Sequence, residues 1–426
     1  MQPRHTQAPS VRASRLALTL IAAASVAPAA WATNGYFPHG FGLKAKGMGG
    51  ASIALAQDGF AGVNNPAAAM FAGSRLEIGG EIFRPYRDAQ FVGQTPVVES
   101  GRTAFLIPEL GYSAKLSERM AVGLTVYGNG GMNTSYAPFP NGVNLLGGQG
   151  KLGVDLMQLI VAPTVAWQVA DGHALGVSPL LVWQRFEAYG LQAFGMMSSD
   201  PANLTNRGKD NSTGIGVRVG YFGKLGDRVT VGASYSPKIR MSRFDKYRGL
   251  FAGSGDFDIP ANYGVGVALQ ATPTLTLALD ATRIRYGGVP SIANPSLQQV
   301  MAGQPLGGAQ GPGFGWRDIS VVKLGVQWQM NERWTLRAGY NEGQNPIRPD
   351  DAMFNILAPG VIRKHVTFGA TYAPDARTEW TFALWHGKRE NVVGPSVDFS
   401  SMQMNPTGTR IGMHQNGFGV QFSRKF

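Results

Sequence analysis

The chain has 426 residues, including 58 glycines and no cysteine, and only 15% of its residues are charged. The absence of cysteine excludes disulfides and thiolate metal sites. The formal net charge is +12, but the basic residues form no dense cluster with interleaved aromatic residues, which argues against a nucleic-acid partner. No apolar run after residue 32 reaches about 18 residues, so no transmembrane helix is predicted there.

Residues 1–32 have the pattern of a secretory signal peptide. Three arginines precede an apolar run from Leu16 to Ala30, and Ala30-Trp31-Ala32 forms an A-x-A cleavage site. A membrane anchor would need about 20 apolar residues, which this run does not reach. We therefore predict an exported protein whose mature chain starts at Thr33.

Residues 33–73 are predicted to form a plug. The stretch Gly40–Phe71 is rich in glycine and alanine, lacks strand alternation, and contains Asp58 and the tripeptide Asn65-Pro66-Ala67. Glycine permits close backbone contacts and left-handed turns. Because such a segment is poorly suited to fold alone, we expect it to pack inside a larger enclosure.

Period-two patterning dominates residues 74–426. For example, Ile215, Val217 and Val219 alternate with Gly216 and Arg218. Alternation over ten or more residues is typical of a strand with lipid on one side and a lumen on the other, whereas strands of soluble sandwiches average about 5–6 residues. At about 25 residues per strand and connection, the sequence predicts an all-β transmembrane antiparallel β-barrel of about fourteen strands with a small N-terminal hatch in its lumen.

The connections also follow the pattern of an outer-membrane barrel, in which short periplasmic turns alternate with long extracellular loops. Seven tryptophans lie mostly near predicted strand ends, where interfacial girdles occur. The expected loops lie near 131–152, 190–212, 246–257, 287–315, 342–360 and 388–411.

Three blocks resemble the FadL family of outer-membrane transporters of long-chain fatty acids and other hydrophobic compounds. They are Gly40–Phe71 with its Asn65-Pro66-Ala67 motif, Phe105–Gly131 and Lys246–Ala268. The resemblance implies a fourteen-stranded barrel in the outer membrane of a Gram-negative cell, with an N-terminal hatch. We expect a monomer without cofactors, in contact with outer-membrane lipid and lipopolysaccharide.

Catalytic and metal-binding motifs are not recognisable. The chain lacks H-E-x-x-H, G-x-S-x-G and P-loop patterns, and the histidines after residue 32 are dispersed without metal-ligand spacing. We therefore predict no catalytic residues and no metal site. An outer-membrane hydrolase and a general porin for small polar solutes stay as alternatives of other classes.

Apolar side chains gather in two predicted extracellular loops. Exposed apolar clusters are unfavourable unless they pack together or bind something. The resemblance implies that the third and fourth loops form a groove that captures substrate, and the alternative is that the loops pack against one another. The candidates are Phe194, Met196, Met197, Leu204, Tyr247, Leu250, Phe251 and Phe257.

Three basic residues are predicted to face the lumen: Arg218, Lys323 and Arg337. Any of them could pair with a fatty-acid carboxylate through a charge-assisted contact. Pairing of these lumen charges with Asp58 of the hatch is the alternative.

The predicted third strand is rich in glycine at Gly123, Gly128, Gly130 and Gly131. Glycine in a strand weakens pairing and marks bulges or bends. The resemblance implies a kink here that opens the barrel wall near the Asn65-Pro66-Ala67 segment, and the alternative is a strand that ends in a glycine-rich loop at Gly130. The expected function is passive diffusion of hydrophobic compounds with lateral release, by default of long-chain fatty acids and alternatively of aromatic or alkane hydrocarbons.

Overall fold

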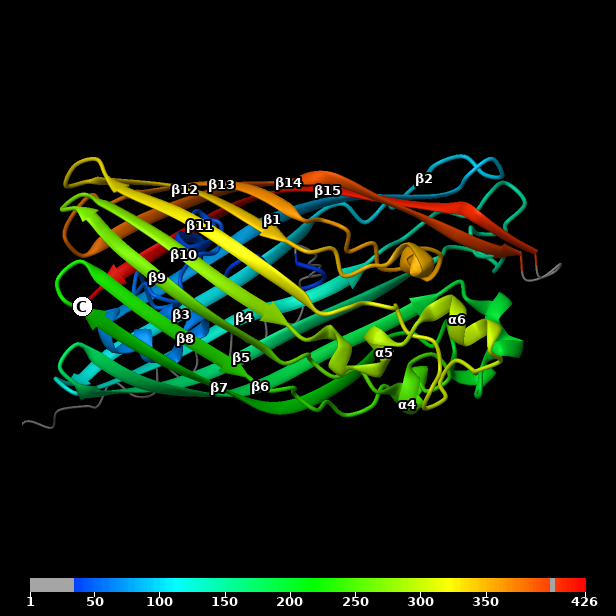
Figure 1. Ribbon diagram of the computed structural model, residues 1–426, viewed down its shortest axis with the longest axis horizontal. Coiled ribbons are helices and arrows are strands. Elements are labelled where there is room, and N and C mark those ends of the chain that lie inside the picture. Colours follow the sequence, from blue (N-terminus) through cyan, green and yellow to red (C-terminus); the bar gives the residue numbers. More distant parts are fainter. Residues whose placement is uncertain (1–33, 399–402) are drawn as a thin grey trace, which may run out of the picture.

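The computed structural model describes residues 34–398 and 403–426, whose strands form one antiparallel sheet (Figure 1). Neighbours in sequence pair in order, and β15 pairs with the whole of β1, which closes the barrel. Fourteen long strands build the wall of this described part, and the short β2 is an addition that pairs only with β1. The predicted all-β barrel is confirmed.

The strands have the following bounds: β1 Arg75–Phe91, β2 Val98–Glu99, β3 Phe105–Ser117, β4 Met120–Asn133, β5 Gly153–Ala170, β6 His173–Tyr189, β7 Asp210–Leu225, β8 Val229–Ser236, β9 Asn262–Thr272, β10 Leu275–Ile284, β11 Ile319–Gln329, β12 Trp334–Gly343, β13 Lys364–Tyr372, β14 Thr378–Asp398 and β15 Gln403–Lys425.

Side chains alternate between the outer surface and the lumen as the period-two pattern predicts. On β7, Ile215 is 76% exposed and Arg218 is 5% exposed. Apolar residues on the exposed face suit contact with lipid chains, because such a surface would be unfavourable in water. No helix within residues 34–398 and 403–426 is long and apolar enough to cross a membrane.

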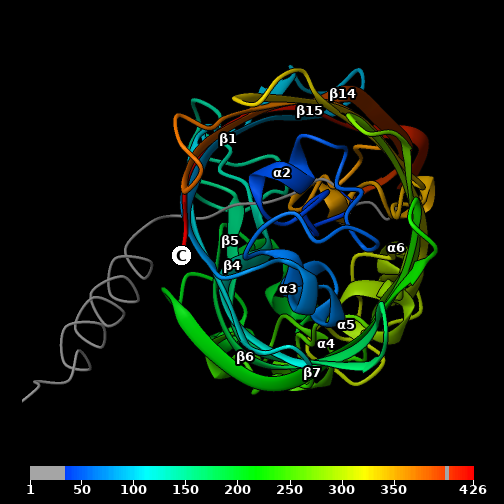
Figure 2. The same cartoon turned by 90° about the vertical axis from the view of Figure 1, so that its left-hand side faces the viewer.

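Residues 34–73 lie inside the ring of strands (Figure 2). They form a coil with the short helices α2 (Leu43–Lys46), α3 (Ala61–Asn64) and η1 (Pro66–Phe71), and most of their side chains are buried. We call this segment the hatch. The predicted signal peptide and Thr33 lie outside the described residues.

Positive charges on α2 attach the hatch to carboxylates of the barrel wall. Lys46 Nζ lies 2.6 Å from Glu81 Oε2 on β1 and 3.4 Å from Glu109 Oε2 on β3. Lys44 Nζ lies 2.6 Å from Glu379 Oε2 on β14. These five side chains are at most 10% exposed. Since a buried charge without a partner is strongly unfavourable, the ion pairs hold the hatch in one position against the wall.

The long connections form a cap at one end of the barrel, at the right of Figure 1. Their short helices are η2 (Gln192–Met197), η3 (Pro201–Asn203), η4 (Asp245–Tyr247), α4 (Ala252–Gly255), η5 (Tyr286–Gly288), α5 (Pro290–Ala293), α6 (Ser296–Met301), η6 (Pro349–Asp351) and η7 (Phe354–Ile356).

The expectation of a loop at 388–411 is wrong, and two of the seven tryptophans expected near the interfaces lie elsewhere. Residues 388–411 are not mainly a loop, because β14 and β15 continue through them as a long hairpin whose outermost pair is Asp398↔Gln403. Hydrogen bonds between β14 and β15 satisfy the backbone groups of both strands beyond the membrane as well as within it. A polar composition therefore does not end these strands. Trp316 and Trp385 do not belong to an interfacial girdle, because both are buried inside, with Trp316 Nε1 donating to Asn355 Oδ1 at 2.6 Å.

Candidate functional site

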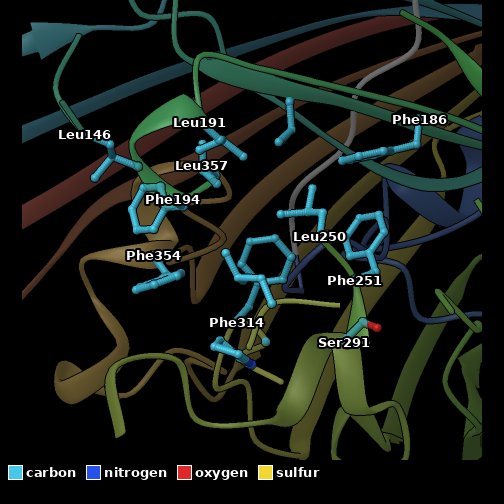
Figure 3. A pocket seen from close by; sticks show the side chains of 14 residues that line it. Leu146, Phe186, Leu191, Phe194, Leu250, Phe251, Ser291, Phe314, Phe354 and Leu357 are labelled. Carbon is cyan, nitrogen blue, oxygen red and sulfur yellow. The ribbon is translucent and has the colours of Figure 1, made fainter. Parts of the chain in front are cut away.

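An apolar cavity lies among the loops of the cap (Figure 3). Three of the predicted capture residues, Phe194, Leu250 and Phe251, line it. Its cavity volume is about 40 Å³, whereas a dry cavity that binds benzene has about 150 Å³. Entry of an aromatic molecule therefore requires side chains to move apart. We call this cavity the chamber.

The other predicted capture residues have different surroundings. Leu204, Tyr247 and Phe257 are buried in the packing of the cap, Met197 is partly buried against it, and Met196 is fully exposed. Phe257 packs on Phe251 with ring centroids 4.8 Å apart. The loops thus pack extensively against one another, as the alternative prediction had it, and leave the small chamber between them.

Sequence reasoning missed most of the chamber wall. Phe186 comes from β6, Phe314 from the loop before β11, and Phe354 and Leu357 from the loop before β13. These residues converge on the third and fourth loops in Figure 3. The available signal was apolar residues in the loops at 287–315 and 342–360, but their partners are decided by the packing of five separate loops.

A second, wider cavity of about 640 Å³ lies beside the chamber, toward the β14–β15 hairpin. Ala193 and Met353 line this outer cavity, and the next residues in the chain, Phe194 and Phe354, line the chamber. The rings of Phe194 and Phe354 have centroids 5.6 Å apart. This aromatic pair therefore stands between the two spaces.

Tyr36 of the hatch closes the lumen on the inner side of the cap. It lines a space of only about 10 Å³ with Met132 of β4 and Trp316, and its ring centroid lies 6.1 Å from that of Trp316. Residues of the hatch and wall fill the barrel below. The hatch lies within the ring of strands with most of its side chains buried, whereas a general porin has a wide water-filled bore.

The three predicted lumen cations face inward but do not form one site. Arg218 donates to the carbonyl of Val63 in the hatch, and it lines a cavity of about 70 Å³ together with Lys323. Arg337 lies elsewhere, donating to Gln327 Oε1 at 2.9 Å and to Thr371 Oγ1 at 2.7 Å. Both guanidinium groups are therefore already used by internal contacts.

Asp58 has a local role in the hatch. Its Oδ1 accepts from the backbone N–H of Phe60 at 3.0 Å. In the residues that the structure describes it forms no salt bridge within 4.0 Å, so direct pairing of a lumen cation with Asp58 is not found. The hatch provides lysines and the wall provides carboxylates, which is the reverse of that expectation.

The Asn65-Pro66-Ala67 motif anchors the hatch to the wall at β6 and β7. Asn65 Nδ2 donates to the carbonyls of Ile53 at 2.9 Å and Tyr221 at 2.8 Å. A β-carbon at Gly220 would overlap Asn65, so glycine is required for this close approach. The motif lies against these strands, and the hatch residue at the glycine-rich part of β4 is Tyr36 instead.

The barrel wall is interrupted between β3 and β4. The two strands pair from Ser117↔Met120 to Leu110↔Val126 and no further, although β3 extends from Phe105 and β4 extends to Asn133. Beyond the break, β3 stays paired with β1 and β4 stays paired with β5. We call the unpaired stretch between β3 and β4 the gap.

The glycines of β4 differ in their relation to the gap. Gly123 lies in the regular part, paired with Ser113, whereas the β4–β5 register shifts between Gly128 and Gly130. Such a bulge bends a strand. Residues 127–133 are all buried, although successive residues of a wall strand normally alternate between a buried and an exposed side. Gly131 still pairs with Met157. The strand therefore continues inward past Gly130 and does not end in a loop there.

The hatch contacts both edges of the gap. The carbonyl oxygen of Tyr36 occupies the place where a side chain on Gly130 would begin, and Lys46 pairs with Glu109 of β3. The position of the hatch is thus coupled directly to the two strands that border the gap.

Together, the lipid-facing barrel, the filled lumen, the apolar chamber and the gap in the wall define a plugged outer-membrane channel for hydrophobic molecules. A profile of the family described as outer membrane protein transport protein (OMPP1/FadL/TodX) matches residues 20–426, so the chain belongs to this family. It is a transport protein of the Gram-negative outer membrane and not an enzyme. No curated protein matches the chain.

Several solved structures share the fold. The P. putida toluene transporter TodX has a TM-score of 0.66 at 21% identity, covering 91% of this chain and 99% of that chain. A Pseudomonas aeruginosa FadL homologue has a TM-score of 0.70 at 17% identity, covering 92% and 100%. The Ralstonia pickettii toluene transporter TbuX has a TM-score of 0.65 at 18% identity, covering 91% and 99%.

Proposed function

We propose that this protein carries neutral hydrophobic small molecules, with monoaromatic hydrocarbons as the first candidates, by passive diffusion from the cap through the chamber and out of the gap into the bilayer. The single observation that supports this route most strongly is the loss of pairing between β3 and β4 beyond Leu110↔Val126. A closed wall would leave an apolar passenger facing the hatch and the aqueous periplasm.

The driving force is the transfer of apolar surface out of water, about 25 cal/mol per Å². The chamber offers such a molecule aromatic and aliphatic side chains, and Ser291 is the one hydroxyl-bearing residue in its lining. Beyond the gap, the hydrocarbon of the bilayer is an equally apolar environment. Net uptake then follows the concentration gradient and needs no energy source.

The chemistry of the interior favours neutral compounds over fatty acids. Arg218 and Arg337 already donate to carbonyl, amide and hydroxyl oxygens of the barrel and hatch, so a carboxylate would have to displace those partners. The similarity to TodX and TbuX, both described as toluene transporters, points the same way.

Long-chain fatty acids are the second candidate because of the cavity that Arg218 shares with Lys323. Burial of the Arg218 side chain leaves its Nε without a hydrogen-bond partner. A carboxylate placed there would meet two cations. If Arg218→Ala and Lys323→Ala both leave fatty-acid uptake intact, a carboxylate-binding role for these two cations is excluded; if neither variant nor wild type takes up fatty acids, this second candidate is excluded.

Deletion of Asn129 tests the lateral route. This residue is the extra one of the bulge, since Gly128 and Gly130 pair with consecutive residues of β5. Its removal should straighten β4 and permit pairing with β3. In a host lacking its own transporter, we expect uptake of labelled toluene to fall at least about tenfold.

Folding of the deletion variant is checked by its heat-modifiable migration in gels. Undiminished toluene uptake by a folded variant would contradict lateral release. A steady high conductance of the wild-type protein in planar bilayers would instead favour the porin alternative, and we expect no such conductance. We expect the channel to act as a monomer, since one barrel contains the chamber, the hatch and the gap.

A further inference from the structure

The outer surface of β14, β15 and β1 changes from apolar to polar within one row of side chains. Residues paired across neighbouring strands lie on the same face of the sheet. The last apolar row consists of Ile82, Phe418 and Leu384, which are 48%, 43% and 53% exposed. The next outward row toward the cap consists of Arg84, Asn416 and His386, which are all exposed.

Basic and aromatic groups continue above this border. Tyr86 and His414 are paired in register and stack with centroids 4.7 Å apart and an interplanar angle of 8°. The guanidinium carbon of Arg84 lies 5.6 Å from the centroid of Tyr86. Lys388 is exposed where the β14–β15 register shifts between Gly387 and Glu390. We call Arg84, His386, Lys388 and His414 the basic patch.

Two members of this patch, Arg84 and Lys388, carry a fixed positive charge. Within the described residues, neither Arg84 nor Lys388 takes part in an ion pair within 4.0 Å. Asp88, an acidic residue of the same region, is held by Arg389 at 2.5 Å and Arg410 at 3.6 Å. Two fixed positive charges are thus left exposed at the membrane border.

Arginines on another part of the wall do have an acidic partner. Arg283 near the end of β10 is half-buried, its Nη2 lies 3.7 Å from Asp318 Oδ2, and Nε of the nearby, exposed Arg285 lies 2.5 Å from the same oxygen. The uncompensated charge is therefore a property of the β14–β15–β1 surface and is not shared by every basic residue near the rim.

We propose that the basic patch binds the phosphate groups of lipid A, the anionic glycolipid of the outer leaflet, while the apolar row beneath it contacts the acyl chains. Long loops mark the extracellular end of an outer-membrane barrel, so the patch faces the outer leaflet. Arginine binds phosphate through paired N–H donors, and tyrosine favours the interface between head groups and chains. The arrangement of a basic row directly above an apolar one matches such a lipid.

Equilibrium binding of fluorescent lipid A to the purified full-length protein in detergent tests this site. The probe is lipid A with both phosphates, compared with the same lipid after removal of its phosphates. For the double variant Arg84→Gln/Lys388→Gln, we expect affinity for the intact lipid to fall roughly thirtyfold. This is the combined loss of binding free energy expected when two basic side chains near an anionic surface are removed. The dephosphorylated lipid should bind wild type and variant equally weakly.

The matched control is Arg283→Gln/Arg285→Gln, which removes the same two positive charges from the site paired with Asp318 and should leave affinity unchanged. Inorganic phosphate at millimolar concentration should not displace the lipid, since the acyl contacts contribute to binding. Equal affinity of the double variant and wild type would overturn the proposal, as would equal binding of the dephosphorylated lipid to wild type. Toluene uptake should be normal in the double variant. Failure of the lipid-binding proposal therefore leaves the proposed transport route untouched, and failure of the transport route leaves the lipid-binding proposal untouched.

Discussion

Tyr36 of the hatch and Gly130 of β4 approach so closely that a β-carbon on Gly130 would overlap the carbonyl oxygen of Tyr36. The contact joins the first described part of the hatch to the bulge beside the gap. Because the ring of Tyr36 also packs against Trp316 under the cap, one residue touches both the inner end of the entrance and the edge of the exit.

Substitution of Gly130 should therefore impair transport without preventing barrel assembly. We expect Gly130→Ala to force Tyr36 and β4 apart and to reduce toluene uptake about tenfold. Gly101→Ala is the control, because its nearest neighbour, the carbonyl oxygen of Ser135, lies 3.7 Å from the added β-carbon. Equal uptake by both variants would show that the contact has no role.

Loss of Lys46 should loosen the hatch. Lys46→Met leaves the buried carboxylates of Glu81 and Glu109 without their lysine, and removal of one partner from a buried ion pair typically costs about 3–5 kcal/mol. We expect faster proteolysis of residues 34–73 and a measurable ion conductance in planar bilayers. The triple variant Lys46→Met/Glu81→Gln/Glu109→Gln should recover part of the protection, because its carboxylates are gone. Unchanged proteolysis of Lys46→Met would argue against an electrostatic anchor.

Phe194 should contribute to capture of aromatic substrates. Phe194→Ala removes one ring of the pair with Phe354, and such aromatic contacts are worth about 0.5–1.5 kcal/mol. We expect the toluene concentration for half-maximal uptake to rise about two- to tenfold. Met196→Ala, at a fully exposed position of the same loop, should have no effect. If the two variants behave alike, the chamber is not on the route.

Acidification should weaken docking of the hatch through His39. Burial lowers the pKa of His39 well below its usual range, and the nearby His365 and Lys46 lower the pKa further. The unfolded chain takes up the proton below about pH 6.5 while the folded chain does not, so stability is full above that pH and declines as the pH falls below it. We expect a lower urea midpoint at pH 5.5 than at pH 7.5, and a smaller difference for His39→Phe.

The period-two pattern was enough to predict the barrel, its approximate number of strands and which faces meet lipid. Ile215 and Arg218 take opposite sides because a strand alternates by geometry, whatever its neighbours are. The composition of Gly40–Phe71 likewise predicted a segment that packs against other backbone. These features depend on local geometry, which a sequence displays directly.

The functional details depend on partners that are far apart in sequence. The gap exists because β3 and β4 follow different neighbours beyond Val126, and the glycines alone did not distinguish this from a strand end. The period-two pattern could place Arg218 and Arg337 on the inner face, but it could not show that the carbonyl of Val63 and the hydroxyl of Thr371 accept hydrogen bonds from them. Only the tertiary structure decided these points, because register, ion pairing and loop packing are set by the closure of the whole barrel around its hatch.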